Sequence, residues 1–219
     1  LDCELPAMSR PLYECLLTGD RPVNSGVVNN QIVRRSTGVS LFDLAVRQGR
    51  RTAAAAYHWV SELYVEAPFK PSQHRFQQNP ESAIQAGLFY WQNHYPDDHL
   101  FSDAEALRRL NDPDFLLVHS MNIDDVGHHH GQSPQSRNAA RRADIALSDY
   151  LPRWLAEGYQ VMVTADHGMN ADNSHSGLLE EERRVPLWLF GDAFDYKSEV
   201  VIRQTHLCGT LATLMGLEH

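Results

Sequence analysis

Four short apolar runs alternate with helical patterns along this 219-residue chain, and that alternation is the strongest constraint on its fold. The runs have the length and the β-rich composition of buried strands. They are RTAAAAYHW (51–59), DFLLVHSM (114–121), YQVMVTAD (159–166) and VPLWLFG (185–191). Strands that alternate with helices predict an α/β fold with a largely parallel central sheet and helices on both faces. The length suits one domain, so residues 1–219 are expected to form a single unit.

Caps and breakers mark the expected helices. Helices are predicted within residues 8–18, 41–48, 136–156 and 205–216. Gly19 closes the first, while Ser40 is the N-cap candidate and Gly49 the stop of the second. Pro152 is expected to kink or split the third helix. Residues 59–110 are rich in Gln, Asn, Pro and aromatic side chains, and they are expected to form an insertion or a cap over a site.

Two of the predicted strands end in metal-binding side chains. Asp124 and His128 follow the run 114–121, Asp166 and His167 follow the run 159–166, and His175 lies on the next loop. Ligands of open α/β sheets bind beyond the carboxyl ends of the strands, so these groups are expected at one edge. Carboxylate and imidazole suit zinc, and also manganese or iron. Each residue alone fits a solvated loop equally well, but five together exceed the needs of one tetrahedral ion and predict two divalent ions.

Ser9 stands just before the first helix, where its hydroxyl is expected to be exposed and helix N–H groups favour an anion. A neighbouring divalent ion would lower the hydroxyl pKa and create a nucleophile. The alternative is that Ser9 is a simple N-cap with Pro11 in the first turn. Arg10 is either a bidentate phosphate clamp or a surface residue beside Pro11.

Charge and composition exclude several other classes. A net charge of −9 makes a nucleic acid polymer an unexpected partner, because backbone phosphates attract clustered Lys and Arg. Three cysteines fit neither a disulfide framework nor a thiolate zinc site, which favours a reducing compartment. No apolar run reaches transmembrane length and no signal-like segment opens the chain, so a cytoplasmic location is expected. The oligomeric state cannot be read from these features.

Three blocks of sequence resemble the alkaline phosphatase superfamily, and within it the type I phosphodiesterase/nucleotide pyrophosphatase group. They are LPAMSRPLYECLLTG (5–19), DDVGHHHG (124–131) and the segment from TADHGMNADNSHSG to VPLWLFG (164–191). The resemblance implies a two-ion hydrolase of small phosphorylated substrates with Ser9 as nucleophile. By the same resemblance, Asp166 and His167 hold the ion that binds Ser9, while Asp124, His128 and His175 hold the other. It also implies a phosphoseryl intermediate.

The chain departs from the family pattern at three places. The family carries a further Asp ligand in a DG turn after a first strand, and this chain has neither that strand nor that Asp. Leu12 stands where nucleotide pyrophosphatases have an Asn that contacts phosphoryl oxygens, which keeps a phosphomonoesterase or a phosphoryl-transfer mutase open. Tyr13 replaces the Arg that sulfatases need. The absent Asp keeps open a binding relative that has lost catalysis.

Overall fold

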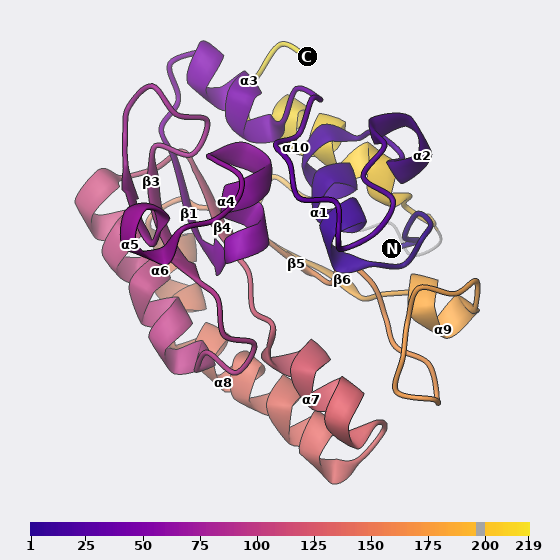
Figure 1. Cartoon of the computed structure of the whole chain (residues 1–219). Coiled ribbons are helices and arrows are strands. Elements are labelled where there is room, and N and C mark those ends of the chain that lie inside the picture. Colours follow the sequence, from indigo (N-terminus) through magenta and orange to yellow (C-terminus); the bar gives the residue numbers. More distant parts are fainter. Residues whose placement is uncertain (196–199) are drawn as a thin grey trace.

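The computed structural model describes residues 1–195 and 200–219 and has an α/β architecture built on a mostly parallel sheet (Figure 1). The strands are β1 (Thr52–Tyr57), β2 (Phe76–Gln78), β3 (Ala86–Tyr90), β4 (Phe115–Val118), β5 (Val161–Thr164) and β6 (Leu187–Phe190). The helices of the first half are α1 (Ser9–Thr18), α2 (Pro22–Ser25), α3 (Leu41–Arg47), α4 (His58–Tyr64), α5 (Pro71–His74) and α6 (Asp97–Asn111). Those of the second half are α7 (Asn122–His130), α8 (Pro134–Ala156), α9 (Glu180–Arg183), the 3₁₀ turn η1 (Gln204–His206) and α10 (Leu207–Leu214).

The main sheet has the order β2-β3-β1-β4, in which β1 pairs in parallel with both β3 and β4 and only β2 is antiparallel. Successive side chains of β1 point to opposite faces of the sheet. Ala54 and Ala56 pack with α1, α3 and α4, whereas Ala53 and Ala55 pack with α6. The alanine run therefore lets helices approach closely on both sides, as Figure 1 shows, and the expected fold class is confirmed.

The second sheet is a two-stranded ribbon of β5 and β6, which pair with each other in antiparallel fashion. In the described part of the chain, β4 pairs only with β1, and β5 only with β6. A cavity of about 660 Å³ lies between them, lined by every residue of β4 and of β5. The sequence did not predict this separation, because the apolar runs of β4 and β5 have the composition of neighbouring buried strands.

Local signals located most helix ends correctly. Gly19 ends α1 in the left-handed conformation at φ 78°, and Ser40 caps α3 through a capping box with Asp43. Pro152 does not split α8, which runs through it unbroken. The last turn of that helix is fixed from outside, because Trp154 Nε1 donates to Glu105 Oε2 on α6 at 2.9 Å.

Residues 59–110 supply β2, β3 and α6 to the main sheet and its covering layer. β3 pairs with β1 over five positions, from Ala53–Ala86 to Tyr57–Tyr90. Much of this range is therefore part of the sheet and its covering layer, and its role as a cap over a site stays a prediction. Among the described residues, no helix combines the length and the apolar character that crossing a membrane requires, and Cys3, Cys15 and Cys208 are all free thiols.

Candidate active site

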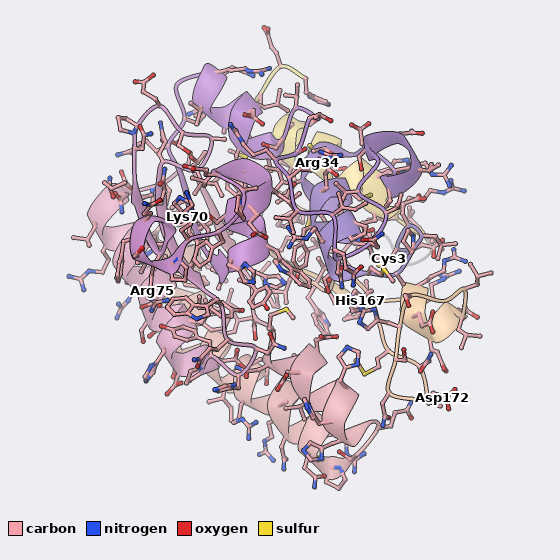
Figure 2. All side chains as sticks on the ribbon, in the orientation of Figure 1. Cys3, Arg34, Lys70, Arg75, His167 and Asp172 are labelled. Carbon is pink, nitrogen blue, oxygen red and sulfur yellow. The ribbon has the colours of Figure 1, made fainter. Side chains whose placement is uncertain are left out.

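Ser9 is the first residue of α1, and its side chain faces the loop that follows β5. Ser9 Oγ lies 3.0 Å from His167 Nε2. The N-cap of α1 is Met8, whose side chain makes no capping bond, so the interpretation of Ser9 as a simple N-cap is wrong. The expectation of an exposed hydroxyl is also wrong, because Ser9 is 3% exposed. His167 covers it, and Figure 2 shows His167 between α1 and α7.

Asp166 and His167 follow directly after β5, at its carboxyl end. His167 Nε2 lies 3.3 Å from Asp166 Oδ2, so Ser9, Asp166 and His167 form one group. Two ligands about 2.1 Å from a shared zinc ion lie roughly 3.4 Å apart in tetrahedral geometry. The spacing of the three side chains is therefore compatible with one shared ion.

Asp124, His128 and His175 form a second group, and their ligand atoms all lie within 4.8 Å of one another. Asp124 and His128 are four residues apart on α7, which places them on the same helix face. His128 Nε2 is 3.5 Å from Asp124 Oδ2, and His175 Nε2 is 3.7 Å from Asp124 Oδ1. The rings of His167 and His175 stack with centroids 3.8 Å apart, so the two groups adjoin.

Backbone carbonyls fix the tautomers of all three histidines. His128 Nδ1 lies 2.8 Å from the Asn173 carbonyl oxygen, His175 Nδ1 lies 2.6 Å from that of Ala7, and His167 Nδ1 lies 2.9 Å from that of Gly168. A carbonyl oxygen only accepts, so each Nδ1 carries the proton and each Nε2 keeps its lone pair. This is the arrangement that orients a histidine toward a metal ion.

One contact and two unpartnered carboxylate oxygens in the site would be satisfied by a cation. His128 Nε2 and His175 Nε2 lie 3.1 Å apart, although in this tautomer neither has a proton to donate. Asp124 Oδ1 and Asp166 Oδ2 are buried without a hydrogen-bond partner. Buried carboxylate oxygens without partners are costly, and a divalent cation between these atoms would satisfy them. The residues therefore fit metal binding.

Burial also shifts the pKa values of this group. It raises the pKa of the Asp124 carboxyl, against the lowering effect of His167 and His128. It lowers the pKa of the His175 imidazole, and the neighbouring His167 lowers it further. A neutral imidazole is the form that binds a metal, and a bound cation would favour the ionised Asp124.

Arg10 is not a surface residue, because it is 1% exposed. Its Nη2 lies 2.7 Å from Glu62 Oε2 on α4, and its guanidinium sits 4.8 Å above the Trp59 ring. The Arg10 backbone N–H donates to Asn30 Oδ1 at 3.0 Å. That N–H is therefore occupied and unavailable to a phosphoryl oxygen, contrary to what the position of Ser9 before a helix suggests.

Gln204 is a supporting residue that no sequence motif marked. Its Nε2 donates to the Asp166 carbonyl oxygen at 2.8 Å, and its Oε1 accepts the Glu4 N–H at 3.1 Å. The residue is fully buried and joins the segment before Ser9 to the strand end at Asp166. Its only sequence signal is a polar side chain at the start of an apolar helix.

Comparisons with known proteins agree with this architecture. The sequence profile of the family described as type I phosphodiesterase/nucleotide pyrophosphatase matches residues 1–181. The catalytic subunit of human GPI ethanolamine phosphate transferase 2 is 23% identical over 97% of this chain, which spans 22% of that protein. That of human GPI ethanolamine phosphate transferase 3 is 31% identical over 48% of this chain, which spans 10% of that protein. The chain therefore covers only a small part of these relatives.

Solved structures show the same fold. Murine ectonucleotide pyrophosphatase/phosphodiesterase 5 superposes with a TM-score of 0.74 at 12% identity, covering 100% of this chain and 86% of that one. A 2-O glycosaminoglycan sulfatase, BT1596, superposes with a TM-score of 0.59 at 15% identity, covering 100% of this chain and 62% of that one. The profile match extends over most of the sequence, and the chain belongs to the type I phosphodiesterase/nucleotide pyrophosphatase family.

Proposed function

We propose that this chain is the catalytic part of a metal-dependent phosphoric ester hydrolase of phosphodiesterase type, with Ser9 as nucleophile. The observation that carries the proposal is the contact between Ser9 Oγ and His167 Nε2 at 3.0 Å, beside the group of Asp124, His128 and His175. The donor set of carboxylates and imidazole Nε2 atoms suits two divalent ions, with zinc the expected metal and manganese or iron as alternatives. Such ions lower the pKa of a hydroxyl and offset charge on phosphoryl oxygens.

The reaction would take place at Ser9, which the fold holds beside His167. Ser9 Oγ attacks phosphorus in line, the leaving group departs on the opposite side, and water then releases the phosphoryl group from Ser9. The backbone of α1 contributes little to charge stabilisation, because the Arg10 N–H is bonded to Asn30 and Pro11 has no N–H. The positive charge that faces the phosphoryl oxygens would therefore come mainly from metal ions bound by Asp124, Asp166 and the three histidines.

Substitutions of Ser9 and of His128, one residue from each group of the site, test the proposal. Ser9→Ala should abolish turnover and leave the metal content, measured by mass spectrometry, nearly unchanged. His128→Ala should lower both. His130→Ala is the matched control, because this exposed neighbour lies outside the group. Full activity in Ser9→Ala would show that the nucleophile is another residue.

Paired substrates decide between ester classes. Initial rates on bis-p-nitrophenyl phosphate and p-nitrophenyl phosphate should favour the diester. Leu12 is fully buried among Cys3, Cys15 and Val185, so it supplies no contact to the phosphoryl group. A preference for the monoester would instead assign a phosphomonoesterase or a phosphoryl-transfer mutase. Stoichiometric metal without turnover of either substrate would support a binding relative.

We also propose that the first strand of the family pattern, which residues 1–219 do not contain, would fit between β4 and β5. Its support is the cavity between β4 and β5, which apolar side chains of both strands line and whose adjoining strand edges are unpaired in the described residues. The cavity reaches His119 and Asp166 at the carboxyl ends of β4 and β5. A further carboxylate there would complete the group around Ser9. A longer chain that carries residues upstream of Leu1 should unfold at a higher temperature and protect β4 and β5 from hydrogen exchange. Unchanged protection would reject this strand.

A further inference from the structure

The first turn of α1 carries Ser9, and no N-cap side chain fixes its direction. Burial is common to the whole helix, because Ser9 and Pro11 are buried as Leu12 is. The N-cap residue Met8 contributes no side-chain bond, and uncapped helix ends fray. Polar contacts from outside the helix must therefore fix the direction of the turn that carries the proposed nucleophile.

Asn30 takes the place of an N-cap side chain, and Arg10 is the first-turn residue that donates to it. Its backbone N–H donates to Asn30 Oδ1, and its Nε donates to the Asn30 carbonyl oxygen, both at 3.0 Å. Its Nη2 pairs with Glu62 at 2.7 Å. Glu62 is itself fixed, because its Oε1 accepts the Phe69 N–H at 2.9 Å. The residue next to Ser9 is thus bound to a loop, to α4 and to the ring of Trp59.

This arrangement is poorly explained as a source of stability. The side chains of Arg10 and Glu62 are 2% and 6% exposed, and Arg10 Nη1 is buried without a partner. Desolvation of a buried ion pair offsets its attraction, and apolar residues of similar volume often stabilise a fold as well or better. What the planar guanidinium provides is a fixed direction, because its Nε donates to the Asn30 carbonyl oxygen while its Nη2 faces Glu62 on the same rigid group.

We propose that the Arg10–Glu62 pair positions Ser9 for attack, and that Arg10 does not clamp the substrate phosphate. The inference rests on the proposed nucleophilic role of Ser9. Arg10 and Glu62 are then positioning residues, which act through the first turn of α1 and touch neither the substrate nor the reacting atoms. A displacement of about 1 Å at a nucleophile can reduce a rate 100-fold.

Glu62→Gln and Arg10→Lys test the proposal kinetically. Both should lower kcat roughly 10- to 100-fold while KM and the inhibition constant of inorganic phosphate stay within about twofold. The clamp interpretation requires the opposite: Arg10→Lys raises KM and weakens phosphate inhibition, while Glu62→Gln leaves kcat unchanged. That result would overturn the proposal.

A double variant separates positioning from folding. Arg10→Met with Glu62→Leu replaces the pair by apolar side chains, and it should retain the melting temperature while kcat stays low. The matched control is Arg108→Met with Glu105→Leu, which removes another buried pair (7% and 9% exposed) outside the site. It should leave kcat unchanged whatever it does to the melting temperature. Recovery of wild-type kcat in the first double variant would reject positioning.

A readout without turnover keeps this inference distinct from the proposed function. In metal-free protein, the ¹⁵N resonance of His167 Nε2 reports its contact with Ser9 Oγ, and Ser9→Ala gives the value for a lost contact. Glu62→Gln should move the resonance toward that value, even if Ser9 proves not to be the nucleophile. An unchanged resonance in Glu62→Gln would overturn the proposal, whereas turnover in Ser9→Ala would overturn only the function.

Discussion

The two halves of the candidate site stand on regions that differ sharply in how they are built. Asp124 and His128 follow β4 of the main sheet, in which β1 is buried along its whole length and paired on both sides. Asp166, His167 and His175 follow β5 of the ribbon, whose outer strand exposes 54% of Trp188. One half is supported by a packed core, and the other mainly by contacts made at the site itself.

This difference assigns a structural role to the site. The bond from Gln204 to Asp166 and the contacts Ser9–His167 and His128–His175 connect the ribbon to the rest of the chain. Local stability follows the density of packing, so the ribbon should open more readily than the main sheet. A cation held by ligands from both regions would then also bind the regions together.

Metal binding should give the largest effect. A ligand at about 1,000 times its dissociation constant stabilises by roughly 4 kcal/mol, which for a chain of this size is a rise in melting temperature of about 10 °C. Zinc should produce this rise, and a chelator should reverse it. The rise should disappear in Asp124→Asn and persist in His130→Ala. Hydrogen exchange should slow more in β5 than in β1, and equal slowing would contradict the comparison.

Two leucine truncations give the next largest difference. Leu63 is 1% exposed in the core against the main sheet, whereas Leu189 on β6 is 36% exposed. Leu63→Ala should lower the free energy of unfolding by about 3 kcal/mol, because it removes buried methyl groups and leaves a cavity. Leu189→Ala should cost less than about 1 kcal/mol. Urea unfolding measures both, and similar losses would show that the ribbon is packed as firmly as the sheet.

The sequence predicted the features that depend on neighbouring residues. The strand ends that carry Asp124 and Asp166, the cap at Ser40 and the stop at Gly19 are all set locally. The grouping of Asp124 with His128 and His175 followed from the resemblance, and the structure brings these three side chains together. Their role as metal ligands remains a prediction.

The features that the sequence missed depend on partners far along the chain. Strand pairing is not local, so nothing in the run 185–191 indicated that β6 would pair in antiparallel fashion with β5. The burial of Arg10 depends on Glu62, Trp59 and Asn30, which no motif links to it. Gln204 contacts Asp166 across 38 residues. Such contacts follow from packing and leave no periodic pattern.

The smallest expected effect concerns the link between α6, which covers the main sheet, and α8, which leads into β5. Glu105 on α6 accepts from Arg108 Nε at 2.8 Å, Trp154 Nε1 at 2.9 Å and Arg153 Nη1 at 3.2 Å.

The hydrogen bonds from Arg108 are the main reason that the pKa of Glu105 falls to about 2, against 4.5 for a free Glu. A carboxyl with a depressed pKa in the folded state stabilises the fold above pH 4.5, and this stabilisation is lost as the pH falls toward 2. The free energy of unfolding of the wild type should therefore fall more steeply over that interval than that of Glu105→Gln, whose side chain has no proton to gain. Hydrogen exchange should accelerate first in β5, because α8 loses its hold on α6. If the free energy of unfolding falls equally with pH in the two proteins, or if hydrogen exchange accelerates first in β1, the ribbon does not depend on this link.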